Sequence, residues 1–154
     1  SEYVTRAAEK LRKQKCVSGL LMVFLSTNRF KEGPQYNNSL STTLFPPTAY
    51  TPELIKTALD LLEELYLPGF EYKKAGVMLA DIIPEKDVPL SFMEINYLDD
   101  KRKKLMETID KLNKTFGQDT LFYASSGINK DWKMKRAKLS PHYTTYWKDI
   151  PRVK

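Results

Sequence analysis

The sequence predicts an α+β fold, and three observations support this prediction. Apolar residues recur at helical spacing in residues 4–11 and 54–65. Apolar or alternating runs typical of β-strands occupy residues 20–25, 40–45 and 75–83. The resulting order of helix, strand, strand, helix and strand matches a split βαβ arrangement, βαββαβ, whose first strand is missing. We therefore expect the helices to cover one face of a sheet and the other face to be free for a partner.

The pattern begins with a helix that is followed by an apolar strand. Val4, Ala8 and Leu11 share one side of the helix. Gly19 separates this helix from residues 20–25, which contain no polar side chain. Such a run is typical of a strand that is buried on both faces, and we expect this strand to be enclosed in that way.

The next three elements are a strand, a helix and a strand. Residues 40–45 alternate in side-chain character, which predicts a half-exposed strand that ends at Pro46. The following helix has Thr51 as its expected N-cap and Pro52 at its first helical position, where no hydrogen bond is lost. The apolar residues 75–83 predict the last strand of the sheet.

The remainder of the chain has a different character. Residues 85–100 are acidic and lack periodicity, so we expect a linker. An amphipathic helix is predicted over residues 105–117, and a candidate short strand over residues 120–123. The expected organisation is therefore a first domain over residues 1–84, the linker, and a small basic unit over residues 101–154.

Length and composition bound the class of protein. The chain has 154 residues, of which 42% are hydrophobic and 29% charged, with a net charge of +6. These values support one compact domain, or one small domain plus a shorter unit. The single cysteine, Cys16, excludes a disulfide scaffold and a multi-cysteine metal site. Because no apolar run is long enough to span a membrane and no signal peptide is evident, we expect a cytoplasmic protein without a membrane partner.

Charge is distributed unevenly along the chain. Residues 1–30 carry a net charge of +4, residues 31–85 carry −4, residues 86–100 carry −3 and residues 101–154 carry +9. Basic ends around an acidic middle favour a polyanionic partner that touches both ends. A solvated surface with lysines that serve solubility is an equally common explanation.

The sequence offers no catalytic constellation. A nucleophile needs a base, but Cys16 is far along the chain from the single histidine, His142. Clustered carboxylates for metal-dependent chemistry and a glycine-rich phosphate loop are both lacking. We therefore expect no catalysis, no metal site and no cofactor in this part of a protein.

Candidate polyanion-binding residues lie near the ends of the predicted strands. They are short polar or cationic side chains that suit phosphate oxygens. An ordinary polar sheet rim explains them about equally well. The set comprises Ser26, Thr27, Asn28, Arg29, Lys31, Asn37, Asn38, Ser39, Ser41, Thr42, Lys73 and Lys74.

A second candidate stretch, residues 130–138, interleaves cations with Trp132. Such mixtures can bind phosphates and stack on bases. Trp132 and Met134 can equally be core anchors of a small unit, and we weigh that explanation more heavily for Trp132.

Two stretches resemble the C-terminal part of UmuC-type Y-family DNA polymerases, which are bacterial translesion enzymes of the DNA polymerase V type. One is A-G-V-M-L-A-D-I-I-P at residues 75–84, and the other is D-W-K-M-K-R-A-K-L-S-P-H-Y-T-T-Y-W-K-D-I-P at residues 131–151. Residues 110–113 and Phe116–Gly117 also resemble that family. The tail motif is long and irregular, so chance is a poor explanation for it. Its key residues are Trp132, Met134, Lys135, Arg136, Leu139 to Pro141, Tyr143 to Thr145, and Trp147.

The resemblance covers essentially the whole chain and implies a function. Residues 1–84 resemble the little finger, which holds primer-template DNA, including damaged DNA in the SOS response. Residues 101–154 resemble the small C-terminal domain of the family. Catalysis, with its expected Mg²⁺, would belong to palm, fingers and thumb, which are absent here. By position, the implied DNA-facing residues are Arg29, Lys31, Asn38, Ser39, Ser41, Thr42, Lys73 and Lys74.

The chain departs from the family pattern in two ways. It starts inside the first helix, so we expect a fragment whose open sheet edge could be filled by dimerisation or strand swapping. The family's sliding-clamp motif is degenerate, because Pro89 stands where a glutamine is typical. The apolar Leu90, Phe92 and Met93 remain to bind a clamp, although more weakly.

Two classes of function follow from these observations. The first is a non-catalytic DNA-binding and partner-binding part of an error-prone repair polymerase, for which the resemblance implies a UmuD-type subunit and RecA as partners. The second is a protein-interaction module that docks other subunits and has negligible affinity for DNA.

Overall fold

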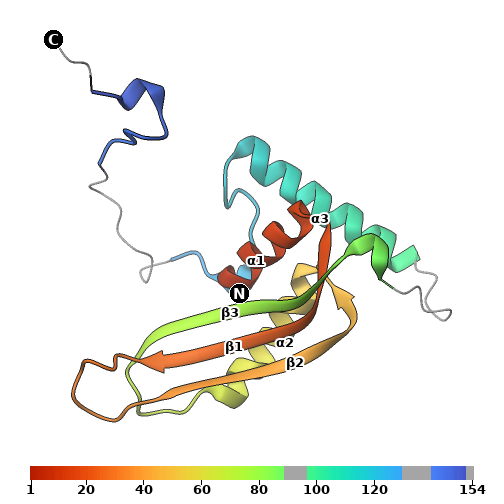
Figure 1. Cartoon of the computed structure of the whole chain (residues 1–154). Helices are drawn as coiled ribbons and strands as arrows, with labels where there is room; N and C mark the ends of the chain where they lie inside the picture. The colour runs from red at the N-terminus through yellow and green to blue at the C-terminus, as the bar shows by residue number, and fades with distance from the viewer. Residues whose placement is uncertain (89–96, 130–139, 152–154) are drawn as a thin grey trace.

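The computed structural model describes residues 1–88, 97–129 and 140–151. They form a mixed α+β structure with three α-helices and one three-stranded sheet (Figure 1). The helices and strands are α1 (Glu2–Lys13), β1 (Cys16–Thr27), β2 (Asn37–Thr48), α2 (Thr51–Leu65), β3 (Tyr72–Pro84) and α3 (Tyr97–Phe116). Three short 3₁₀ turns occupy Glu85–Asp87, Ala124–Ser126 and Trp147–Asp149.

The sheet has the predicted split βαβ arrangement. Its strand order is β2-β1-β3, and β1 runs antiparallel to both neighbours. Strands β2 and β3 are connected through α2, so β1 is inserted between the two strands of a βαβ unit (Figure 1). The α+β prediction and the order of these five elements are therefore confirmed.

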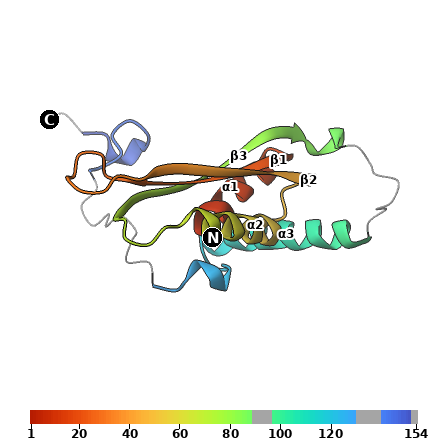
Figure 2. The same cartoon turned by 90° about the horizontal axis from the view of Figure 1, so that it is seen from below.

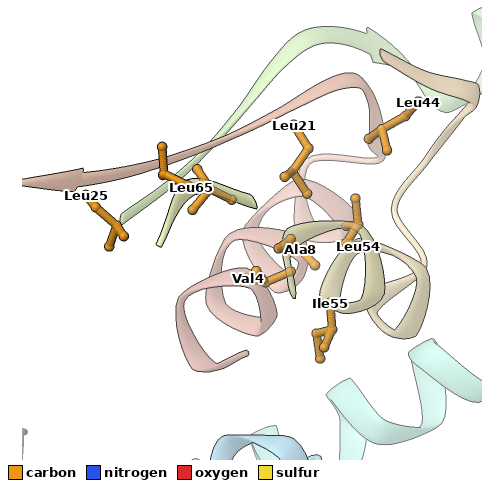
Figure 3. Close-up of a cluster of buried hydrophobic side chains, with 10 residues drawn as sticks. Val4, Ala8, Leu21, Leu25, Leu44, Leu54, Ile55 and Leu65 are labelled. Carbon is orange, nitrogen blue, oxygen red and sulfur yellow. The ribbon is translucent and has the colours of Figure 1, made fainter. Parts of the chain in front are cut away.

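Both α1 and α2 lie on the same side of the sheet (Figure 2). The core forms where alternate residues of β1 meet these helices, because successive side chains of a strand point to opposite faces. Figure 3 shows these side chains converging from the sheet and both helices. The buried cluster comprises Val4, Ala8, Leu21, Val23, Leu25, Leu44, Leu54, Ile55, Ala58 and Leu65.

The prediction that the strand at residues 20–25 is buried on both faces was wrong. Leu21, Val23 and Leu25 are buried against the helices. Their neighbours Met22 and Phe24 are only half-buried, because none of the helices that the structure describes covers the other face of the sheet. We call this uncovered side the open face.

Phe24 lies across Gly76 on the open face. The two residues are directly paired between β1 and β3. A methyl group built at residue 76 would overlap the ring of Phe24, so the ring occupies the space that a side chain on β3 would otherwise fill. Glycine in a strand often marks such a close approach. The ring of Phe24 therefore takes the place of a β3 side chain at the centre of the open face.

The start of α2 differs from the prediction. Tyr50, not Thr51, precedes the helix, and no side chain caps it. Thr51 is fully buried, and its Oγ1 accepts a hydrogen bond from Arg12 at 2.7 Å. The hydroxyl group is used in a tertiary contact instead of a local cap.

Helix α3 lies next to α1, on the helix side of the sheet (Figure 2). The Arg12 guanidinium donates to both carboxylate oxygens of Asp110, each at 2.7 Å, and to the carbonyl of Ala49 at 2.9 Å. Arg6 pairs with Asp119 at 2.7 Å. Met106 is only 2% exposed. Two Arg–Asp contacts thus join α3 and the turn after it to α1.

Two predictions about the later part of the chain were wrong. Helix α3 begins at Tyr97, inside the segment expected to be an irregular linker. Residues 120–123 form no strand. The side chain of Asn113 accepts from the backbone N–H of Leu121 at 2.8 Å and donates to its carbonyl at 2.9 Å, so an amide side chain replaces a partner strand.

Across residues 1–88, 97–129 and 140–151, no helix has the length and apolar character needed to cross a bilayer.

Substituting Asp110 should release α3 from the helical layer. In Asp110→Asn the charged pair with Arg12 is lost, while the contacts of Arg12 to Ala49 and Thr51 remain. We expect the free energy of unfolding to fall by about 1.5–3 kcal/mol, the usual value for hydrogen bonds to charged groups. Urea denaturation measures this change, and hydrogen exchange reports the protection of α3. Glu107→Gln, an exposed charge change on the same helix, is the control. Unchanged exchange in α3 would contradict this account of its docking.

Adding a methyl group at residue 76 should destabilise the sheet. Glycine to alanine normally stabilises a strand, but Gly76→Ala must displace the ring of Phe24. We expect a loss of about 1–3 kcal/mol in the free energy of unfolding, typical of overpacking. In a Phe24→Ala background the same substitution should be neutral or stabilising. An equal cost of Gly76→Ala in both backgrounds, measured by urea denaturation, would contradict the contact.

Candidate nucleic-acid interface

The register of the sheet determines which side chains lie on the open face. Directly paired residues of neighbouring strands point to the same side. Met22, Phe24 and Ser26 alternate with the buried residues of β1, so their partners lie on the open face with them. The open face consists of Leu20, Met22, Phe24 and Ser26 from β1, Asn37, Ser39, Ser41 and Thr43 from β2, and Lys74, Gly76, Met78 and Ala80 from β3.

The two sides of the open face differ chemically. Strand β2 contributes three exposed hydroxyl groups, those of Ser39, Ser41 and Thr43. Strands β1 and β3 contribute an apolar centre that includes Met22 and Met78, and Met78 is 47% exposed. The face therefore combines hydrogen-bond donors on one side with an apolar surface next to them.

The structure separates the residues that the sequence suggested as phosphate contacts. Ser39, Ser41 and Lys74 lie together on the open face. Asn38 and Thr42 pair with Leu25 and Leu21, and therefore point to the helix side of the sheet. Alternation along the strand could have shown that neighbouring residues face opposite ways, but not which set faces the helices.

The remaining predicted cations gather at one end of the sheet. Arg29 and Lys31 lie in the loop between β1 and β2, and Lys73 lies at the start of β3, next to Lys74. This loop and the turn before β3 are at the same end of the sheet (Figure 1). We call these four residues the cationic end.

Local contacts hold the cationic end in place. The guanidinium of Arg29 lies 5.2 Å from the centre of the Phe30 ring. The pairing of β1 with β3 shifts by one residue between Ser26 and Thr27. Lys73 is therefore an extra, unpaired residue in β3, and its side chain is exposed. The hydroxyl of Tyr36 donates to the carbonyl of Leu65 at 2.6 Å. Tyr36 thereby ties the start of β2 to the end of α2.

One predicted cation is paired with an acid. The ammonium of Lys31 contacts the carboxylate of Glu71, which precedes β3. The hydrogen bond from Lys31 holds the pKa of Glu71 below its usual value. The carboxylate therefore stays ionised to a lower pH than an isolated glutamate would. No local sequence signal relates these two residues, which are 40 positions apart.

Other predicted residues fall partly outside the described part of the chain. Leu90, Phe92 and Met93 of the degenerate clamp motif, and Trp132, Met134, Lys135 and Arg136 of the tail motif, lie outside the described residues. Tyr143 and Trp147 are described. They are 51% and 90% exposed and belong to a turn that is closed by Asp149, whose carboxylate accepts from the backbone N–H of His142 at 2.9 Å.

Elsewhere in the described ranges, side chains do not group into a recognisable catalytic or metal-binding site. Over those residues, no three side chains of the His, Cys, Asp or Glu types come together in a way that could hold a metal ion. Cys16 is half-buried, and its thiol donates to the carbonyl of Gln14 at 3.4 Å. The open face and the cationic end are therefore the features that carry the argument about function.

Comparison with known proteins assigns both parts of the chain. The impB/mucB/samB family C-terminal domain matches residues 1–92, and a domain of unknown function (DUF4113) matches residues 103–153. The chain is 39% identical to Protein UmuC of Salmonella typhimurium over 153 residues, which are 99% of this chain and 36% of that protein. It is 36% identical to Protein SamB of Salmonella typhimurium over 154 residues, with coverage of 99% and 36%. Protein MucB of Escherichia coli is 33% identical over 150 residues, with coverage of 97% and 35%.

The chain spans about a third of the length of these curated relatives. The match to the family domain covers more than half of the chain and includes every strand of the sheet. The resemblance to the C-terminal part of UmuC-type proteins is thereby confirmed, and the chain belongs to the impB/mucB/samB family.

Proposed function

We propose that this chain is the DNA-binding and partner-binding C-terminal part of an error-prone translesion DNA polymerase that acts in DNA damage repair. In this proposal the open face and the cationic end bind the phosphates of primer-template DNA, and catalysis belongs to other parts of the polymerase. The observation that carries the proposal is the one-sided construction of the sheet. Helices cover one face, while the other presents Ser39 and Ser41 together with Lys74 of the cationic end (Figure 2).

The chemistry of these side chains suits binding without sequence readout. Hydroxyl and ammonium groups donate to phosphate oxygens, which are the same at every base pair. An exposed apolar centre bounded by polar groups is typical of a surface that meets a partner. A polymerase that copies damaged templates has to hold DNA whatever its sequence, and these groups would do so.

Other parts of the proposed function extend beyond this chain. The whole polymerase would use Mg²⁺ in its own catalytic domains. Leu90, Phe92 and Met93 would give a weakened contact to a sliding clamp, because Pro89 replaces the expected glutamine. A UmuD-type subunit and RecA are the proposed protein partners, with residues 101–154 as the region that meets them.

A protein-docking role is the second candidate. The observation that favours it is the exposed apolar surface of β3, where Met78 is 47% and Ile82 is 51% exposed. Apolar patches of this kind also meet other proteins. Under this alternative, DNA affinity would be negligible and the lysines at the start of β3 would not matter for it.

Substitution of lysine at the start of β3 distinguishes the two candidates. Lys73→Ala and Lys74→Ala should each weaken binding to labelled primer-template DNA, to a similar degree for different sequences. Each should reduce the slope of log K against log salt by about 0.9, the value for one neutralised phosphate on duplex DNA. Fluorescence anisotropy across a salt series measures both quantities.

Lys56→Ala is the matched control, because Lys56 is an exposed lysine of α2, on the helix side of the sheet. Its affinity and salt slope should equal those of the unsubstituted chain. Equal losses in all three variants would mean that only total charge matters. Absence of DNA binding by the unsubstituted chain at low salt would reject the DNA-binding proposal in favour of protein docking.

A further inference from the structure

A polar groove lies between the β1–β2 loop and the turn that precedes β3. Its volume is about 390 Å³, and it is lined by residues of both segments. Asn28, Lys31 and Gln35 line it from the loop, and Glu71 and Lys73 line it from the other side. Two of the four predicted cationic-end residues, Lys31 and Lys73, therefore face the same groove.

The Lys31–Glu71 ion pair crosses this groove. The two side chains come from its opposite walls and are 61% and 80% exposed. Exposed ion pairs of this kind contribute little net free energy, because water solvates the separated charges well. The pair can therefore be exchanged for another partner at small cost.

The loop does not depend on this ion pair for its shape. The side chain of Gln35 donates to the carbonyl of Lys31 at 2.7 Å and accepts from the hydroxyl of Thr27 at 2.8 Å. The backbone N–H of Phe30 donates to the side chain of Asn28 at 3.2 Å. Lys31 would therefore stay near the groove if Glu71 were neutralised.

We propose that the groove binds a backbone phosphate of nucleic acid, and that this phosphate replaces Glu71 as the partner of Lys31. This inference rests on the proposed DNA-binding function and adds a regulator to it. In the free protein Lys31 is paired with Glu71. Only a ligand that places its own oxyanion at this position can therefore pair with Lys31. Glu71 consequently lowers the affinity for DNA, because Lys31 has to give up this carboxylate before it can pair with the phosphate.

Neutralising Glu71 should strengthen DNA binding, and this gain should depend on Lys31. Glu71→Gln should tighten the binding of labelled duplex DNA about two- to fivefold at low salt, the range expected for an exposed pair. It should also steepen the slope of log K against log salt by up to about 0.9, because Lys31 no longer has to give up an internal carboxylate. Lys31→Gln should weaken binding.

A double-mutant cycle separates the exchange from a general effect of charge. In a Lys31→Gln background, Glu71→Gln should give no gain. Glu64→Gln changes the net charge equally at an exposed position of α2 and should leave DNA affinity unchanged. Circular dichroism and thermal denaturation of each variant, with Glu71→Ala as a second neutral substitution, verify that the fold is retained.

The outcomes distinguish this inference from the proposed function. DNA binding by the unsubstituted chain without any gain in Glu71→Gln overturns the exchange and leaves the DNA-binding proposal in place. A gain of equal size with and without Lys31, or in Glu64→Gln, overturns it in the same way. Absence of binding in every variant overturns the proposed function and this inference together.

Discussion

The central position of β1 is the constraint on which the remaining structure depends. Strand β1 pairs with both other strands, and paired residues point to the same face. The alternation of side chains along β1 therefore determines which residues of β2 and β3 lie on each face of the sheet. A shift of one residue in either pairing would move every side chain of that strand to the opposite face. Asn38 and Thr42 would then replace Ser39 and Ser41 on the open face. The composition of the candidate interface is therefore a consequence of burying Leu21, Val23 and Leu25.

A second constraint acts where α1 meets α3. Arg12 contacts Ala49, Thr51 and Asp110, which come from the segment before α2, its first residue and α3. Side chains of Arg12 and Asp110 are 15% and 29% exposed, so this pair is less screened by water than Lys31–Glu71. The two ion pairs accordingly have different roles: one holds helices together, whereas the other lies at a solvent-filled groove.

Sequence patterns were sufficient for the order of elements and the family. Helical spacing, apolar runs and proline positions are local patterns, so they can be recognised without knowledge of the fold. The face of the sheet to which each strand residue points could not be deduced from the local sequence. Residues 20–25 are apolar at every position, and such a run does not reveal that Met22 and Phe24 stay half-exposed. The open side of the sheet depends on where the helices pack.

Long-range pairings explain the other differences between expectation and structure. Thr51 has the sequence context of an N-cap, but its hydroxyl accepts a hydrogen bond from Arg12, which is 39 positions away. Leu121 and its neighbours have the composition of a strand, but the amide of Asn113 satisfies the backbone of Leu121. In the candidate site, Lys31 has the charge expected of a phosphate contact, and only the structure shows its pairing with Glu71.

The position of α3 has a consequence for assembly. The open face and α3 lie on opposite sides of the sheet (Figure 2). A large molecule on one side leaves the other side accessible, so two partners can be held at the same time without steric competition. Any influence of one partner on the other would then have to pass through the sheet and the helices, where Arg12 contacts both α3 and the start of α2.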